Sequence, residues 1–548
     1  MPLLLSKKAA RGRRQVRRNQ SVLASYNLEI LMITRRNALR TGSLIAATAA
    51  ARLNPDFFFT SAFAASGKTL RFMGPESLTG NWDPTSHTNL GQLTVEGLVM
   101  GYLTRARMEK GSTDKLDFDL ATSLKTIDEF TIEVKLRSGV KFHDGKPFKA
   151  ADVKATFEYG SQPDRPAQWY PGRVDVEVVD DLTCRISTKK HGYPANMFYF
   201  LSSFLPIMSA GDIADKKRLS ARLNGTGPFK LNEQKGDSTF LVANPTYYAG
   251  APKLPGVEYR AVGDATTRVL SLLNGEADVI ERLEPEQADT VSKNPAFSIN
   301  KVISTENKFL FFRCSKPPFN DERVRRAAAY AIDRKMIVEI LGASGAASKA
   351  HISPVKFGYV DVATYPEFDP DKCQKLLAEA GFPKGKGLPT LTYYTSTGFY
   401  PKTKDYGEII ASMLQAQGFP VKLEVLEVAA WGNLLYDKQG GGEGHMIDCG
   451  WCTGSPEPDL VLRTHFHSSS KRICGIVDKE IDASLDRERN AKSIDERRNI
   501  LRTDTLPLLA QKVPALSLFT SVFIHGYRKD LKGMFIYPNG MLDLSKAI

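Results

Sequence analysis

This sequence of 548 residues has no long apolar run after its N-terminal region, and it contains only 6 cysteines, 8 histidines and 4 tryptophans. A membrane-spanning helix needs about 20 consecutive apolar residues, so we expect no spanning segment after the N-terminal region. With 42% hydrophobic and 25% charged residues, the composition excludes wholesale disorder. A chain of this length can form two or three domains around a large core.

The chain also has little excess positive charge once its first residues are set aside. The formal net charge is +13, of which residues 1–64 carry +9 and all the remaining residues together carry +4. A nucleic-acid-binding protein concentrates basic side chains on its folded domain. The charge distribution therefore argues against a nucleic-acid partner, and we expect none.

Residues 1–64 have the features of an export signal behind a basic arm. The segment TRRNALR at 34–40 resembles the twin-arginine motif, and a short apolar run follows it. Residues 62–64, AFA, have the small-x-small form of a signal peptidase site. We predict a basic arm and a twin-arginine-type signal peptide over residues 1–64, with Met32 as an alternative start. No cysteine lies near the predicted cleavage site, so no lipid anchor is expected there.

The most informative segment spans residues 130–159, FTIEVKLRSGVKFHDGKPFKAADVKATFEY. Apolar and polar residues alternate over 132–137, which predicts a strand with one buried face. The Asp-Gly pair at 144–145 predicts a turn, and a helix is expected to begin near Ala150. His143 and Asp144 could suggest a catalytic pair, but we interpret both as turn residues. Adjacent side chains on a hairpin point in different directions, and no Ser or Cys nucleophile is locally paired with them.

Residues 136–153 closely resemble the signature of the extracellular solute-binding proteins of the peptide, opine and nickel group (family 5), which supply ABC importers. The sequence departs from that signature at Lys149, where the family usually has a Ser or Thr that caps the helix. A second block, PPFNDERVRRAAAYAID at 317–333, also resembles the family. The resemblance extends over almost all of residues 66–548.

The resemblance implies an α/β protein with a two-lobed periplasmic binding protein type II fold and an extra α+β subdomain in the first lobe. Residues 309–313 are expected to form a strand that crosses between the lobes. The Gly-rich element at 224–229 is interpreted as chain re-entry into the first lobe, because it lacks the Lys-Ser/Thr of a phosphate-binding loop. The expected parts are lobe I (65–116), the extra subdomain (117–223), the second part of lobe I (224–305), lobe II (306–514) and the return to lobe I (515–548).

The resemblance also implies a function. We expect a periplasmic receptor that encloses a peptide-like, opine-like or related small polar solute in a cleft and delivers it unchanged to the permease of an ABC importer. Such a receptor is expected to be a monomer, to need no cofactor and to catalyse no reaction.

Aromatic side chains at the ends of second-lobe strands are expected to form walls of the ligand cleft. Trp451 and Trp431 are the best candidates because a tryptophan offers a large flat face with one donor. The competing interpretation of each is ordinary core packing. A first-lobe loop that contains Ser77 and Thr79 is expected to face the same cleft, and its alternative is an exposed connection.

The segment GWCTGSPEP at 450–458 resembles the frame G-W-x-x-D-x-x-[DE]-P of the family's peptide binders, whose Asp pairs with the ligand's α-ammonium. Here Gly454 stands at that position, and a buried ammonium without a carboxylate is costly. A ligand without a free α-amine is therefore favoured, unless another acid such as Glu76 takes the role of the Asp. The expected ligand-binding residues are Trp451, Trp431, Gly454, Thr453, Cys452, Ser77, Thr79, Glu76 and Tyr394.

Cys449 and Cys452 have the C-x-x-C spacing of a redox pair or of half a zinc site. The alternative function is therefore an exported thiol-redox or metal-dependent enzyme that uses this pair with His465 and His467. Two features weaken it, because the histidines are closer together than in a zinc finger and the pair precedes a loop rather than opening a helix. We expect a structural disulfide of one of these cysteines with Cys474, or else buried thiols, and no metal.

Overall fold

The computed structural model describes residues 67–86, 89–108, 116–162, 173–203, 205–397, 400–435, 442–470 and 473–548. The basic arm, the signal peptide and the cleavage site predicted for residues 1–64 lie outside these residues. Residues Phe63–Ile548 form one compact unit. Among the described helices, none combines the length and apolar character that crossing a membrane requires.

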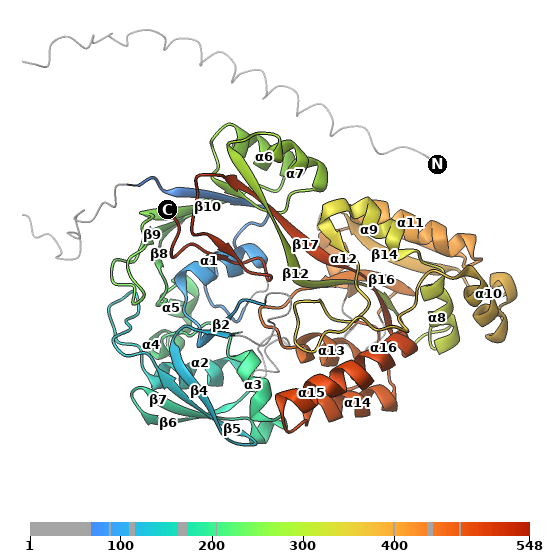
Figure 1. The fold of residues 1–548 in the computed structure, drawn as a ribbon, viewed down its shortest axis with the longest axis horizontal. Coiled ribbons are helices and arrows are strands. Elements are labelled where there is room, and N and C mark those ends of the chain that lie inside the picture. Colours follow the sequence, from blue (N-terminus) through green and yellow to red (C-terminus); the bar gives the residue numbers. More distant parts are fainter. Residues whose placement is uncertain are drawn as a thin grey trace, which may run out of the picture. The chain divides into compact units, whose positions relative to one another are not determined.

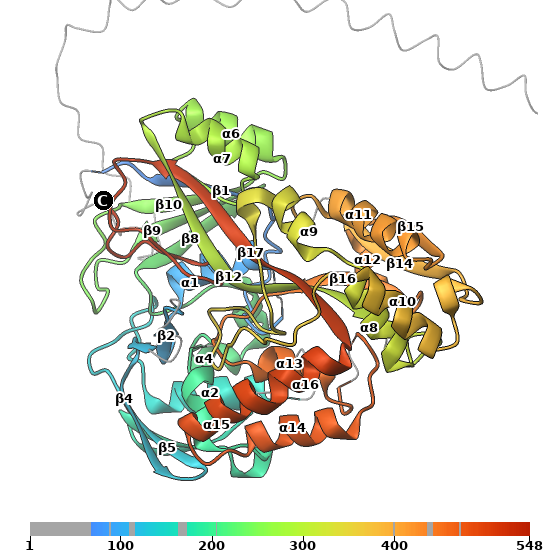
Figure 2. The same cartoon turned by 45° about the vertical axis from the view of Figure 1, so that its right-hand side comes forward.

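One 11-stranded sheet runs through the compact unit in the order β15-β14-β16-β12-β17-β11-β1-β10-β9-β8, and β13 pairs with β17. Its two long strands, β12 (Phe297–Phe312) and β17 (Ala515–Arg528), pair antiparallel and cross from one end of the sheet to the other (Figures 1 and 2). The strand expected at 309–313 is therefore confirmed, but it starts earlier. Its first half mixes apolar and polar residues, is mostly half-buried, and pairs with β17, which is distant in the sequence.

One end of the sheet is formed by five strands, of which β1 pairs in parallel with both β10 and β11. Apolar residues alternate along β1 and β10, and their inward faces bury Leu70, Phe72, Val257 and Tyr259. The elements at this end are β1 (Leu70–Gly74), β8 (Phe229–Lys235), β9 (Ser238–Ala243), β10 (Gly256–Ala261), β11 (Val279–Ile280), α1 (Leu90–Val99), α6 (Ala265–Leu273) and α7 (Pro285–Ser292).

At the other end, β14 pairs in parallel with β15 and β16, and β16 pairs antiparallel with β12. Phe309, Phe311, Tyr393 and Ile447 belong to the largest buried cluster there. The strands are β14 (Leu391–Thr397), β15 (Val421–Glu427), β16 (Met446–Trp451) and β13 (Gly345–Ala346). The helices are α8 (Glu322–Tyr330), α9 (Arg334–Leu341), α10 (Pro370–Glu379), α11 (Thr403–Ala416), α12 (Val428–Leu435), α13 (Asp459–Phe466), α14 (Lys479–Arg489), α15 (Ile494–Ile500) and α16 (Leu506–Lys512).

A separate four-stranded sheet, β4-β5-β7-β6, contains the signature segment. As expected, the segment forms a strand, a turn and a helix, namely β5 (Thr131–Leu136) and α2 (Ala150–Gly160). The remaining elements here are β4 (Ala121–Asp128), β6 (Asp175–Asp180), β7 (Thr183–Ser187), α3 (Ala195–Leu201), α4 (Ala210–Ile213) and α5 (Lys216–Ala221). Two small pairs complete the fold, β2 (Thr104–Ala106) with β3 (Leu116–Phe118) and β18 (Phe535–Ile536) with β19 (Leu542–Asp543).

The turn of the signature segment binds the Gly-rich element. The backbone N–H of His143 donates to Gly225 O at 2.9 Å, and His143 Nε2 lies 3.1 Å from Gly227 O. Burial lowers the pKa of His143 to about 4. Asp144 forms an ion pair with Arg222 at 3.1 Å. Both residues of the suspected catalytic pair thus have structural partners, as a turn requires.

The start of α2 is held by a carboxylate of its first turn. Lys149 occupies the N-cap without a side-chain cap bond, as the departure from the family pattern predicts. Asp152 instead accepts hydrogen bonds from Lys149 N at 2.9 Å and from Ala210 N at 2.8 Å. Asp152 therefore satisfies a free backbone donor at the helix N-terminus and ties α2 to α4.

Gly225→Ala is expected to destabilise the protein by about 2 kcal/mol or more. A Cβ atom at Gly225 would lie 2.0 Å from Val99 O and 2.9 Å from Met100 Cα, and these backbone atoms cannot rotate away. Gly432→Ala on α12 is the matched control, because no heavy atom lies within 4 Å of its Cβ position. Urea unfolding measures both variants, and equal stabilities would contradict the close packing of the Gly-rich element.

Candidate functional site

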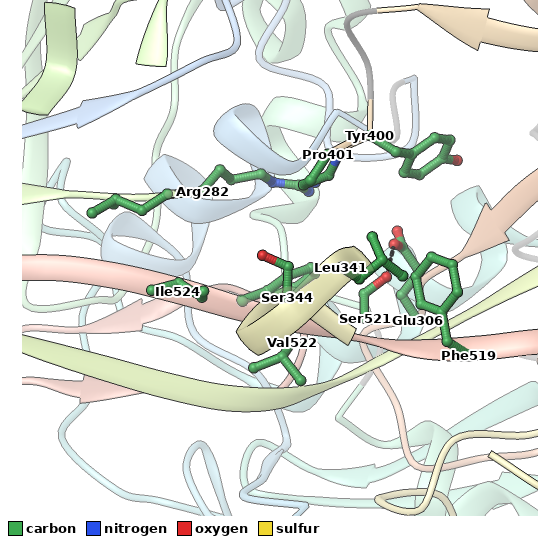
Figure 3. A pocket seen from close by; sticks show the side chains of 12 residues that line it. Arg282, Glu306, Leu341, Ser344, Tyr400, Pro401, Phe519, Ser521, Val522 and Ile524 are labelled. Atoms are coloured by element: carbon green, nitrogen blue, oxygen red, sulfur yellow. Dashed lines mark hydrogen bonds between the residues drawn. The ribbon is translucent and has the colours of Figure 1, made fainter. Parts of the chain in front are cut away.

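A pocket of about 420 Å³, counted out to its open side, lies beside the crossing strands β12 and β17 (Figure 3). We call it the crossing pocket. Glu306 on β12 and Phe519 and Ser521 on β17 form part of its wall. Arg282, two residues after β11, and Tyr400, in the segment before α11, complete it from opposite ends of the main sheet.

Arg282 is the basic residue of the crossing pocket. Its backbone has a φ of 56°, and its guanidinium lies over the Phe523 ring, 4.8 Å from the centroid. Burial alone lowers the pKa of Arg282, but the nearby carboxylates of Glu76 and Glu306 outweigh this effect and raise it. Arg282 therefore stays charged at any physiological pH.

Glu306 is the acidic residue of the same pocket. Its side chain is buried, with the residue 5% exposed, and its Oε1 accepts a hydrogen bond from Ser521 Oγ at 2.6 Å. A Cβ atom at Gly450 would meet the Glu306 carboxyl carbon at 2.7 Å, so glycine at that position leaves room for the carboxylate. The first residue of the 450–458 frame thus shapes the site.

Tyr400 forms an aromatic wall whose position is fixed from behind. Its hydroxyl accepts from Gly450 N at 3.1 Å, and the ammonium of Lys308 lies 3.2 Å from its ring centroid. Lys308 is fully buried, and burial lowers its pKa. An ammonium over the negative face of the ring is a favourable cation–π contact, so Lys308 holds Tyr400 in place without entering the pocket lining.

The structure places the two tryptophans predicted as ligand contacts near this wall but outside the pocket lining. Trp431 is buried, donates from Nε1 to Asp448 O at 3.2 Å, and packs edge-on against Tyr400 with ring centroids 6.1 Å apart. Trp451 ends β16, is half-buried, and meets His465 edge-on at 4.7 Å. Trp431 thus supports the wall that Tyr400 presents to the pocket.

The predicted residues Cys452, Thr453 and Gly454 follow β16 in a loop beside β12. Thr305 Oγ1 donates to Thr453 O at 2.9 Å and lies 3.1 Å from Cys452 Sγ. Lys356 Nζ donates to Thr453 Oγ1 and to Ser455 O. Because Thr305 precedes Glu306 on β12, the loop lies next to the pocket, and Gly454 is half-buried within it.

The first-lobe residues predicted for the site lie in the loop between β1 and α1. Glu76 Oε2 accepts from Gly91 N at 2.9 Å, and its charge acts on Arg282. Ser77 and Thr79 are exposed. Glu76 is therefore near the pocket, whereas Ser77 and Thr79 are solvent-facing in this structure.

Tyr394 lies apart from the other predicted residues. It sits on β14 opposite Ile447, near the beginning of β16, whereas Trp451 ends that strand. A Cβ atom at Gly444 would touch the Tyr394 ring at 2.5 Å, so the ring packs on the turn before β16.

Of the two expectations for the cysteines, the disulfide is wrong, because all six are free thiols, and the buried thiol holds for all but the half-buried Cys452. Cys474 lies beside Cys314, whose N–H donates to Cys474 O at 2.7 Å, rather than beside the C-x-x-C pair. Burial raises the pKa of Cys449 to about 12 and that of Cys452 to about 11. Within the ranges that the structure describes, no three His, Cys, Asp or Glu side chains gather in a metal-binding arrangement.

Sequence reasoning missed the residues that line the crossing pocket. Arg282, Glu306, Tyr400 and Ser521 are absent from the predicted set. One signal was present, since Glu306 and Lys308 are charged residues in the fully buried second half of β12. Charges at such positions mark a functional or paired site more often than a packing site.

Comparisons with known proteins agree with this fold. The family model "Bacterial extracellular solute-binding proteins, family 5 Middle" matches residues 115–472. The glutathione-binding protein GsiB of Escherichia coli (strain K12) is 26% identical over 445 residues, which cover 78% of this chain and 84% of GsiB. GsiB of Salmonella typhimurium is 26% identical over 431 residues, covering 75% and 82%.

Solved structures share the fold along nearly their whole length. The oligopeptide-binding protein AppA from Bacillus subtilis, in complex with a nonapeptide, aligns with a TM-score of 0.74 and 22% identity, covering 88% of this chain and 98% of AppA. MoaA from A. tumefacien R10, in complex with mannopinic acid, gives 0.74 and 24%, covering 88% and 99%. NikZ from Campylobacter jejuni, in complex with Ni(L-His), gives 0.73 and 21%, covering 86% and 97%.

Proposed function

Because this chain belongs to the bacterial extracellular solute-binding proteins of family 5, we propose that it is the periplasmic receptor of an ABC importer and that its solute occupies the crossing pocket. The family role of capturing a solute for an importer also fits the relatives that match most of the chain. The relatives named for glutathione and mannopinic acid support a peptide-like or opine-like small polar solute.

The position of the crossing pocket carries this proposal. Its wall combines Arg282, next to β11 at one end of the sheet, with Tyr400, next to α11 at the other end. The two ends are joined by the long strands β12 and β17 (Figure 2). A solute in contact with both ends favours the arrangement in which they are close together, which is how a hinged receptor signals occupancy.

The proposal includes the remaining expectations for the chain. The signal over residues 1–64 exports it, the mature protein acts as a monomer, and the closed form docks on the permease subunits. The lobe boundaries are those expected above, with 306–514 as the second lobe. The residues Trp431, Cys452, Thr453 and Glu76 act around the pocket as supports of its walls and charges.

The alternative of a thiol-redox or metal-dependent enzyme gains no support from the site. A reactive cysteine needs a lowered pKa and an accessible thiolate. Here burial raises the pKa of both Cys449 and Cys452, and Cys449 is almost fully buried. We therefore propose that the solute leaves the protein chemically unchanged.

Native mass spectrometry of protein purified from its own cells tests the function. We expect a non-covalently bound small solute that is released intact on denaturation and raises the melting temperature when it is added back. Ser344→Phe, which adds a ring in the pocket wall, should weaken its binding at least about tenfold. Ser292→Phe on the exposed face of α7 is the control and should bind normally.

Uptake by the cells provides the second readout. Deletion of the gene should abolish accumulation of the same labelled solute, and the Ser344→Phe variant should restore it poorly. Conversion of the solute into a product by the purified protein, or unchanged uptake in the deletion strain, would contradict the receptor function.

A further inference from the structure

The crossing pocket holds two opposite charges that act on each other at a distance but form no ion-pair contact. Arg282 and Glu306 both line it. Within the described part of the chain, neither side chain forms an ion pair with the other or with any third residue. Figure 3 shows Arg282 extending toward Pro401, while Glu306 lies beside Ser521 on the side of Phe519.

Glu306 is buried and Arg282 is half-buried, and neither is in contact with a charged partner among the described residues. Among these residues, the carboxylate of Glu306 is hydrogen-bonded only by the neutral Ser521 hydroxyl. Arg282 stacks on Phe523, and its buried Nε has no hydrogen-bond partner among the described residues. Burying a charge without a partner costs several kcal/mol in general, so a protein that keeps both charges benefits from a ligand that pairs with them.

The types of the two side chains indicate which ligand groups they take. A guanidinium presents a planar fork of donors that matches a carboxylate. A carboxylate in an otherwise apolar wall selects a protonated amine. Leu341, Phe519 and Ile524 add apolar side chains to the lining of the same pocket.

Resting on the proposed function, we propose that the crossing pocket binds a small zwitterion, with the ligand carboxylate on Arg282 and its protonated amine on Glu306. The apolar residues then contact the ligand's side group. The pocket is open to solvent on one side, so the two charges rather than an enclosed volume select the ligand. The solute is therefore an amino acid, a dipeptide or a conjugate that keeps a free carboxylate and a free amine.

This assignment changes one expectation from the sequence. Gly454 stands where the peptide binders' Asp holds an ammonium, and this favoured a ligand without a free amine. Glu306 now supplies a carboxylate from β12 instead of from the loop after β16. The loop and the strand are adjacent through the contacts of Thr305 with Cys452 and Thr453, so the replacement acid faces the same region.

Thermal shift and calorimetry with capped and uncapped probes test the proposal. The probes are the 20 free L-amino acids and the 20 Ala-X dipeptides, each also as the N-acetylated and the C-amidated form. We expect at least one uncapped probe to bind, and we expect either cap to weaken its binding by about 30- to 100-fold.

Two variants assign each ligand end to its residue. Arg282→Gln should weaken binding of the uncapped probe by about 30- to 100-fold but change binding of its C-amidated form less than about threefold. Glu306→Gln should weaken binding of the uncapped probe by the same factor but change binding of its N-acetylated form less than about threefold. Lys404→Gln is the control on α11, because Lys404 is exposed and its partner Glu408, at 3.8 Å, lies on the same helix. Arg282→Lys keeps the charge but loses the planar fork of donors. Its affinity for the uncapped probe should lie between those of the native protein and of Arg282→Gln.

The outcomes separate this proposal from the function on which it rests. If capped and uncapped probes bind equally, or if native mass spectrometry finds a solute without an amine or a carboxylate, the zwitterion assignment is overturned while the receptor function stands. If no probe binds, no solute is retained and uptake does not depend on the gene, both fail. Variants with an unchanged melting temperature in the unliganded state show that lost binding is not lost folding.

Discussion

Arg497→Met is expected to lower the free energy of unfolding by about 3–5 kcal/mol. Arg497 is fully buried, and its guanidinium donates to the two carboxylate oxygens of Glu457 at 2.5 and 2.7 Å and to Glu488 at 2.8 Å. Methionine has a similar length but no charge, so two carboxylates would remain buried without a counter-ion. Urea unfolding at neutral pH measures the loss.

Two further variants show whether the loss comes from the stranded carboxylates. Adding Glu457→Gln and Glu488→Gln to the Arg497→Met protein should recover part of the stability, because no unpaired charge remains inside. Lys404→Met, which removes an exposed pair with Glu408 at 3.8 Å, should change stability by less than about 0.5 kcal/mol. A loss below about 1 kcal/mol for Arg497→Met would contradict the role of this buried triad.

The triad explains one fixed residue of the 450–458 frame. Glu457 occupies the frame's second acidic position, and its bonds to Arg497 tie the loop after β16 to α15. Ser455 Oγ in the same loop donates to Phe200 O on α3. The loop that borders the crossing pocket is therefore held by hydrogen bonds to both α15 and α3.

Glu281→Gln is expected to become more stable relative to the native protein by about 2.5 kcal/mol as the pH rises from 5 to 8. Burial raises the pKa of Glu281 to about 7, from an ordinary value of 4.5, although Arg282 and Arg268 act in the opposite direction and Glu76 adds to the rise. Between these values the folded protein holds a proton that the unfolded chain has released. The stability that this proton provides is present below pH 4.5 and is lost as the pH passes 7, and a glutamine cannot lose it.

The nearest histidine does not complicate this pH range. His525 Nε2 lies 3.9 Å from Glu281, and burial lowers the pKa of His525 to about 3, so it is neutral between pH 5 and 8. Urea unfolding of both proteins at several pH values measures the difference. Glu339→Gln, at an exposed position on α9, should follow the native pH profile. Parallel profiles for Glu281→Gln and the native protein would refute the raised pKa.

Local patterns in the sequence were enough to predict the signature segment. Residues 131–136 alternate in polarity and form β5, and the Asp-Gly turn precedes α2. These features depend on neighbours within a few residues, so they need no knowledge of the fold. The roles of Trp431 and Trp451 could not be predicted in this way. Trp431 lies on α12 rather than at a strand end, and Trp451 ends β16. Whether a tryptophan packs inside or faces a ligand depends on what lies opposite it in the fold. In the structure Tyr400 stands between Trp431 and the pocket.

By itself the sequence determined the solute-binding family, the mixed α/β architecture and the crossing strand. Each of these can be predicted from short motifs and from the spacing of apolar residues along the chain. Only the tertiary structure decided which charges share a pocket and which are tied up in ion pairs. Arg282, Glu306 and Tyr400 come from separate segments, and they meet because β17 returns from the C-terminal part of the chain to pair with both β11 and β12. The net interaction of such charges depends on distance and burial, and neither quantity is contained in the order of the residues.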